Sequence, residues 1–214
     1  MIRVDECWDV FIKIMIARVK SLRREMKIEI LTYGHPTLKQ KSESVAGMTP
    51  EIRGLIDRMA EAMYSNKGVG LAAPQLGQLL RVVILDVDQV KSETKPRAKG
   101  KLHVLINPEI LWESQEDEPY VEGCLSIPGV DGKVYRPAQI GVRFRNLRFQ
   151  DKEMQAEGLL ARVIQHEVDH LNGILFVDRL GFTQRALIAG KLSKLRKGIR
   201  HPISDERRED KFIF

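Results

Sequence analysis

The residues with the clearest chemical potential are His166, Glu167 and His170, which form the five-residue pattern HEVDH. On an α-helix, side chains four positions apart share a face, so His166 and His170 can bind one metal ion together. Glu167 adjoins the first histidine and can act as a base toward a water molecule that the ion activates. A catalytic zinc-like site takes three protein ligands and keeps one position open. The pattern therefore predicts a metal-dependent hydrolase whose third ligand lies elsewhere.

Cys124 is the best candidate for that third ligand. A metzincin protease would carry its third histidine at the position of Phe176, and the basic helix expected after Gly173 offers no acidic ligand. A cysteine thiolate, in contrast, binds zinc and ferrous iron strongly. Cys7 is the only rival, because the chain has two cysteines. The alternative for Cys124 alone is an inert buried thiol.

The helix that carries HEVDH must be buried to position these side chains. Apolar residues cover most of the circumference of the segment 159–171, which is the pattern of a core helix. Arg162, Gln165 and Asp169 form the remaining narrow polar strip. Because Asp169 faces away from the predicted metal, we expect it to pair with Arg136 and brace the helix.

The surrounding pattern alternates short strands with a few helices. Thr49-Pro50 is a typical helix start, and Asn107-Pro108 is expected to end the second strand. These elements predict an α+β fold in which short, largely antiparallel sheets surround the buried metal-binding helix, with one further helix near the C-terminus. The expected strands cover residues 81–87, 102–106, 140–145, 148–155 and 174–177. The expected helices begin at residues 50, 159 and 183 and end at 66–68, 171 and 197.

Three segments taken together resemble the ordered motifs of the peptide deformylases, most closely the bacterial type with a C-terminal helix. They are residues 68–75 (GVGLAAPQ), 122–126 (EGCLS) and 166–170 (HEVDH), and the likeness extends from about Ile28 to Lys197. The resemblance implies a cytoplasmic metallohydrolase that removes the N-terminal formyl group from formyl-methionine of newly synthesised proteins and releases formate.

The resemblance also implies a role for each motif residue. Glu167 would take a proton from water and return one to the leaving amine, while the Gln75 side-chain amide and the Leu125 backbone N–H would hold the oxyanion. Ferrous iron, Fe(2+), is the implied native ion, with Zn(2+) or another divalent ion as a substitute. The implied metal ligands are Cys124, His166 and His170.

The glycine-rich first motif is expected to line the substrate site. Gly68 and Gly70 let the backbone approach a ligand closely, and Val69, Leu125 and Val163 are the expected apolar pocket for the methionine side chain. Taken alone, the motif is equally consistent with a tight turn into a buried strand.

Composition limits the other functions. The chain has 214 residues, 43% of them hydrophobic, with a net charge of +6 and only two cysteines. This suits one globular domain without a disulfide framework, in a reducing compartment, and no apolar run is long enough for stable membrane insertion. The mild basicity fits either an RNA-containing partner or a plain solvated surface, and no DNA partner is expected.

The predicted division of the chain has four parts. Residues 1–27 form an N-terminal extension with the pattern of an amphipathic helix. It either contacts a membrane surface, or is a dispensable extension, or reflects an upstream start with Met26 as the working initiator. Residues 28–181 form the deformylase catalytic domain, 182–200 a basic C-terminal helix, and 201–214 a charged tail. By resemblance, the basic helix docks on the ribosome near the nascent polypeptide; the alternative is a solvated basic face.

Two other functions remain open at this level. A metalloprotease would cut internal peptide bonds of unformylated peptides. A metal-stabilised binding domain would have four protein ligands and no open position, which would leave Glu167 without a purpose.

Overall fold

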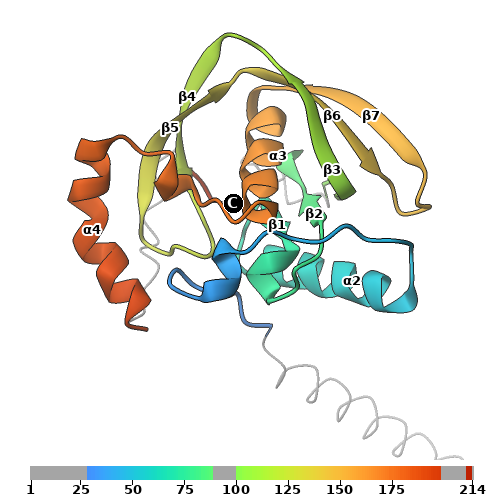
Figure 1. The fold of residues 1–214 in the computed structure, drawn as a ribbon, viewed down its shortest axis with the longest axis horizontal. Helices are drawn as coiled ribbons and strands as arrows, with labels where there is room; N and C mark the ends of the chain where they lie inside the picture. Colours follow the sequence, from blue (N-terminus) through green and yellow to red (C-terminus); the bar gives the residue numbers. More distant parts are fainter. Residues whose placement is uncertain (1–27, 89–99, 199–210, 214) are drawn as a thin grey trace, which may run out of the picture.

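The computed structural model describes residues 28–88, 100–198 and 211–213 (Figure 1). The expected amphipathic helix over residues 1–27 lies outside this part of the chain, as do Cys7 and most of the charged tail. Within the described segments, no helix is both long and apolar enough to cross a membrane.

Two sheets form the framework of the protein. The larger sheet is antiparallel with the order β1-β2-β3-β6-β7, and the smaller has the order β5-β4-β8, with β4 antiparallel to β5 and parallel to β8. The pairing of β6 with β7 across the Asn146 turn confirms the hairpin expected there. The strands are β1 (Gly70–Ala72), β2 (Val82–Leu85), β3 (His103–Glu113), β4 (Asp117–Gly123), β5 (Asp131–Pro137), β6 (Gln139–Arg145), β7 (Asp151–Glu157) and β8 (Lys211–Ile213).

The helices occupy different positions relative to these sheets. Helix α3 (Gly158–Leu171) lies at the centre, α2 (Pro50–Ser65) lies on the other face of the larger sheet, and α4 (Phe182–Arg196) lies on the outside beside β5 (Figure 1). This arrangement confirms the α+β prediction. Short 3-10 helices connect the larger elements: η1 (Pro36–Lys39), η2 (Ala73–Leu76) and η4 (Phe176–Asp178).

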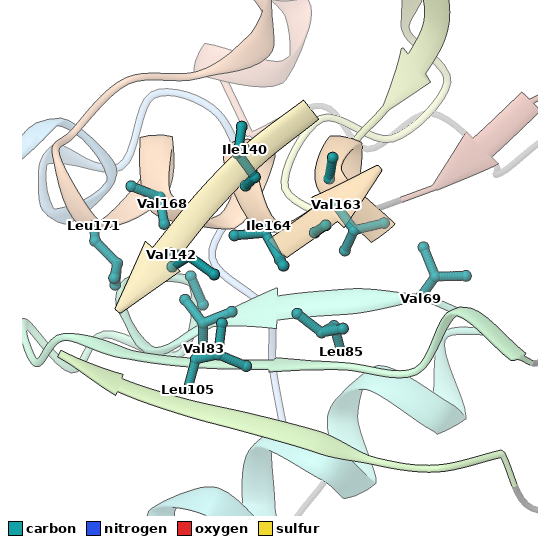
Figure 2. Packing of buried hydrophobic residues seen from close by; sticks show 13 residues of the cluster. Val69, Val83, Leu85, Leu105, Ile140, Val142, Val163, Ile164, Val168 and Leu171 are labelled. Atoms are coloured by element: carbon teal, nitrogen blue, oxygen red, sulfur yellow. The ribbon is translucent and has the colours of Figure 1, made fainter. Parts of the chain in front are cut away.

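Strand β2 shows why the larger sheet is apolar on both faces. Successive side chains of a strand point to opposite faces. Val83 and Leu85 belong to the core cluster with α3, whereas Val82 and Ile84 belong to the cluster with α2. Figure 2 shows Val83 and Leu85 pointing toward α3 residues such as Val163. Helix α3 is thereby fixed against one face of the sheet.

The helix boundaries follow the expected signals closely. Thr49 caps α2 by accepting a hydrogen bond from the Ile52 N–H, and Pro50 occupies the first helical turn. The helix ends at Ser65, just before the expected limit of residues 66–68. Helix α4 is shifted by one residue toward the N-terminus relative to the prediction.

The prediction that Asn107-Pro108 ends a strand is wrong. β3 continues through this dipeptide to Glu113, with a register shift against β6 between Ile106 and Glu109. Asn107 adopts a positive φ of 52°, and its side chain bonds both the N–H and the C=O of Val45. A bulge of this kind accommodates the missing N–H of proline within a strand.

The short strand expected over residues 174–177 is also absent from the described structure, because Phe176 and Val177 belong to η4 instead. The Asp178 carboxylate accepts a hydrogen bond from the Leu175 N–H and stabilises the tight turn. Phe176 and Val177 are buried in the cluster beneath α4. A short apolar run signals burial but does not distinguish a strand from a helical turn.

Candidate active site

His166 and His170 lie on one face of α3, and each is only 1% exposed. Their ring centroids are 5.0 Å apart. The apolar face of α3, with Val163 and Ile164, packs on the larger sheet (Figure 2). The histidines therefore face the end of β4 in the smaller sheet.

Cys124 follows β4 directly and lies opposite these histidines. Its Sγ atom is 3.3 Å from Nε2 of His170, and the sulfur and one nitrogen of each histidine all lie within 4.8 Å of one another. Among the residues that the structure describes, no other group of His, Cys, Asp or Glu has this metal-binding arrangement. Phe176, at the position of a metzincin ligand, instead stacks on His166 with centroids 6.2 Å apart. The structure thus brings together the three donors expected from the sequence.

The chemistry of this group fits a divalent cation. Burial raises the pKa of the Cys124 thiol and of the Glu167 carboxyl, and it lowers the pKa of both histidines. Within the described part of the chain, both Glu167 oxygens are buried without a hydrogen-bond partner, which typically costs about 1–3 kcal/mol per group. A bound cation would offset the effect of burial on Cys124 by stabilising its thiolate, and one thiolate with two neutral imidazoles is the ligand set that suits zinc or ferrous iron. A water molecule beside the ion would give Glu167 its missing partner.

Glu122 orients one of the histidines, a role that the sequence pattern did not predict. Its Oε2 atom lies 3.0 Å from Nδ1 of His166. Burial acts to raise the pKa of Glu122, but hydrogen bonds from His166 and Arg136 lower it, so the carboxylate is ionised. An ionised carboxylate only accepts, so Nδ1–H donates and the lone pair is on Nε2, the tautomer suited to a metal. Its position two residues before Cys124 could have indicated this role, because alternate residues of a strand share a face.

A buried arginine connects this carboxylate to the back of the helix. Arg136 on β5 donates to both oxygens of Glu122 at 2.7 and 3.0 Å, and to Asp169 at 2.6 Å. Arg179 completes the network with two hydrogen bonds to Asp169, and Arg162 donates to Glu122 at 3.0 Å. The expected pair of Arg136 and Asp169 is therefore present, and it ties α3 to both strands of the β4–β5 hairpin.

Replacing Arg136 with methionine is expected to lower the free energy of unfolding by about 3–5 kcal/mol. The substitution keeps most of the volume but removes the cation between Glu122 and Asp169, which are both buried. Urea denaturation followed by circular dichroism measures the change. Arg143→Met is the matched control, because Arg143 pairs with Glu153 at the exposed surface; its midpoint should hardly move. Equal midpoints for both variants would show that the buried network does not brace the helix.

Gln75 lies beside the candidate metal ligands, and hydrogen bonds at both its amide oxygen and its amide nitrogen fix its side chain. Its Oε1 accepts a hydrogen bond from the Ala72 N–H at 2.8 Å, and its Nε2 donates to the Ser126 hydroxyl at 3.1 Å. The same Nε2 is 3.7 Å from the Cys124 sulfur. Leu125 lies between Cys124 and Ser126 in the chain, so its backbone borders the same space. The structure therefore places both expected oxyanion donors close to the metal ligands.

The glycines of the first motif are required by close packing. A Cβ atom on Gly70 would lie 2.4 Å from a Glu167 oxygen and 2.9 Å from Val163, and one on Gly68 would lie 2.7 Å from Leu125. The backbone of this motif therefore passes directly against the carboxyl that could act on water. The motif also leads from a turn into the buried strand β1, so the structure is compatible with both interpretations of it.

Comparison with known proteins agrees with this geometry. The sequence model of the family described as polypeptide deformylase matches residues 27–186, a stretch that contains all three motifs. The chain belongs to the peptide deformylase family. Peptide deformylases are metalloenzymes that remove formyl groups from nascent peptides, so the enzyme class predicted from the motifs is confirmed.

Individual deformylases resemble the chain over most of its length. Peptide deformylase of Phenylobacterium zucineum is 44% identical over 166 residues, which are 78% of this chain and 95% of that protein. The enzyme of Prochlorococcus marinus is 46% identical over 164 residues, 77% of this chain and 78% of that protein. A solved plant peptide deformylase has a TM-score of 0.74 at 32% identity, and the match covers 81% of this chain and 91% of that one. The shared architecture confirms the predicted fold class.

Proposed function

We propose that this chain removes the formyl group from the N-terminal formyl-methionine of newly synthesised polypeptides and releases formate. One observation carries the proposal at the level of residues: the donor atoms of Cys124, His166 and His170 meet within 4.8 Å, beside the buried carboxyl of Glu167. We assign the first three as the metal ligands. Glu167 is the proton-transfer group.

The residues around the metal ligands have distinct roles in hydrolysis of the formyl amide. When bound, the ion lowers the pKa of water and polarises the formyl oxygen. Glu167 accepts the proton of the attacking water and later gives a proton to the departing amine. The Gln75 amide and the Leu125 N–H donate hydrogen bonds to the oxyanion, and such donors are typically worth about 2.7–4 kcal/mol each. Gln75 suits this role because hydrogen bonds to Ala72 and Ser126 fix its side chain before substrate arrives.

The methionine side chain is assigned to the apolar residues next to Glu167. Val69 and Val163 are buried there, and Leu125 is partly exposed. Gly68 and Gly70 allow the backbone of the first motif to lie close to Leu125 and Glu167. A substrate peptide would have its formyl end at the metal ligands.

We assign ferrous iron as the native ion and zinc as a substitute, because one thiolate and two imidazoles suit both ions and the family resemblance implies iron. The cytoplasm is the proposed location, since the substrate is a nascent chain. Purification without oxygen, followed by metal analysis by mass spectrometry, tests the identity of the ion.

Formate release from formyl-Met-Ala-Ser by the iron-loaded chain under anaerobic conditions tests the proposed activity. The expected result is formate and free Met-Ala-Ser in equal amounts. An unformylated peptide with several internal bonds serves as the second substrate and should stay intact. Cleavage of that peptide would favour a metalloprotease, and the absence of formate would refute the deformylase assignment.

The basic helix α4 is proposed to bind the ribosome, and the boundaries at residues 181 and 200 are proposed with it. Leu192 and Leu195 pack into the core cluster under the helix, while Phe182 and Leu187 are 90% and 79% exposed. Lys194 and Lys197 are exposed on the same helix and its C-cap. An exposed surface that is both basic and apolar suits the RNA and protein of a ribosome.

Reversing the charge of Lys194 and Lys197 to glutamate is expected to weaken co-sedimentation with ribosomes at low salt. Hydrolysis of the short formylated peptide should stay unchanged, because neither side chain belongs to the catalytic group. These substitutions are a more specific test than deletion of α4, because the deletion would also expose the core residues that pack against Leu192. The double variant Arg148→Glu/Lys152→Glu is the control, since it removes the same charge from another exposed site. Equal sedimentation of both variants would contradict docking through α4.

A further inference from the structure

A strand near the end of the sequence occupies the edge of β4 that leads to the candidate metal ligands. Residues Lys211–Ile213 form β8, which pairs in parallel with residues 121–123 on the side of β4 opposite β5 (the short red strand in Figure 1). The register places the Ile213 backbone beside Gly123, the residue immediately before Cys124. β8 lies outside the stretch that the family model matches, residues 27–186. This pairing is therefore an addition to the matched deformylase domain.

The same edge of β4 is well placed to hold a substrate. An unpaired strand edge presents backbone N–H and C=O groups that an extended peptide can bind as an added strand. A peptide along residues 121–123 would have one end at Cys124, while Glu122 within this segment contacts His166. The opposite edge of β4 is fully paired with β5 from Asp117 to Gly123. One strand at a time can occupy the remaining edge.

We infer that β8 is an intramolecular competitor that must leave the edge of β4 before a formylated peptide binds there, an inference that rests on the function proposed above. Tethering gives such a segment a high effective concentration, on the order of millimolar. The pairing of β8 with β4 is weak, however, because it comprises three residue pairs and because parallel pairing is less stable than antiparallel pairing. A peptide that also has its formyl end at the metal ligands displaces it.

Deleting residues 211–214 tests the competition by kinetics. The KM for formyl-Met-Ala-Ser should fall about threefold or more, because apparent affinity scales with the fraction of molecules in the binding-competent state. The kcat should stay the same, since the deletion touches no catalytic residue. The synthetic peptide Lys-Phe-Ile-Phe, added to the truncated enzyme, should raise its KM again. Identical KM values for the full and truncated chains would overturn the inference.

A proline variant separates backbone pairing from loss of the segment. Replacing both Phe212 and Ile213 with proline removes the N–H groups of two successive residues, one of which faces β4 in a paired strand, and restricts the backbone of β8; the double alanine variant keeps both N–H groups as the matched control. The proline variant should behave like the truncated chain, and the alanine variant like the full chain. If alanine and proline changed KM equally, backbone competition at the edge of β4 would be excluded.

Hydrogen exchange gives a measurement that does not depend on activity. Amides in residues 121–123 should exchange faster in the truncated chain than in the full chain, because one side of β4 loses its partner. Unchanged exchange would show that β8 does not protect this edge in solution. If neither chain released formate, the proposed function would fail, while the exchange comparison would still decide whether β8 covers β4.

Discussion

Replacing Cys124 with alanine is expected to remove the bound metal and, with it, detectable formate release. The thiol is one of three donors that meet within 4.8 Å, so its loss leaves two imidazoles. Loss of a residue that only orients a ligand typically lowers metal affinity about 10–100-fold, and loss of the ligand itself should exceed this. Metal content per chain, measured by mass spectrometry after anaerobic iron loading, and formate release from formyl-Met-Ala-Ser are the two measurements.

Cys7→Ala is the matched control for this experiment. It removes the only other cysteine of the chain, the rival ligand in the sequence, and it should leave metal content and activity unchanged. Circular dichroism must show that the Cys124 variant is folded, because Cys124 belongs to the cluster beneath α4. Full metal content in the Cys124 variant, or metal loss in the Cys7 variant, would contradict the ligand assignment.

The part of the site that could be predicted from sequence is the part fixed by local geometry. The spacing of His166 and His170 places both on one helical face whatever the rest of the fold does. A Glu and two His within an apolar helix also required a partner, because unpaired buried polar groups are costly. Cys124 could be chosen because the competing ligands were missing from the sequence. These inferences needed no knowledge of strand pairing.

Glu122 and Arg136 show where sequence reasoning ends. Their contact depends on the register of β4 against β5, in which Glu122 lies opposite Gly132 and Arg136 opposite Glu118. A shift of one residue would turn either side chain to the other face of the sheet. The sequence suggested that Arg136 pairs with Asp169, but nothing in it showed that the same guanidinium also orients a metal-binding histidine through Glu122. Long-range register is set by the whole core rather than by a motif.

The two wrong predictions about secondary structure have a related cause. Asn107-Pro108 is a common stop signal for a strand, yet the Val45 backbone satisfies the Asn107 side chain and β3 continues as a bulge. The apolar run at residues 174–177 signalled burial correctly but not its backbone form, which Asp178 determines by closing a tight turn. In both places a contact between residues distant in the sequence, or a single hydrogen bond, overrides the local preference.

Replacing Glu167 with glutamine is expected to lower kcat by about 10²–10⁴-fold while metal content stays at the wild-type level. The space between Glu167 and Gly70 is narrow, because a Cβ atom added to Gly70 would lie 2.4 Å from a Glu167 oxygen. Glutamine fits this space because it has nearly the same shape as glutamate. Its amide cannot take a proton from water. Because the change affects proton transfer rather than substrate binding, KM should change little.

Glu167→Asp distinguishes proton transfer from simple packing. Aspartate retains a carboxyl group but withdraws it by one methylene, so activity should lie between that of the wild type and the glutamine variant. A packing role would rank the variants in the opposite order, since glutamine preserves shape better than aspartate does. Together with Cys124→Ala, which loses the metal, these variants separate the two halves of the site. If the glutamine variant kept near wild-type kcat with its metal bound, another group would have to move the proton.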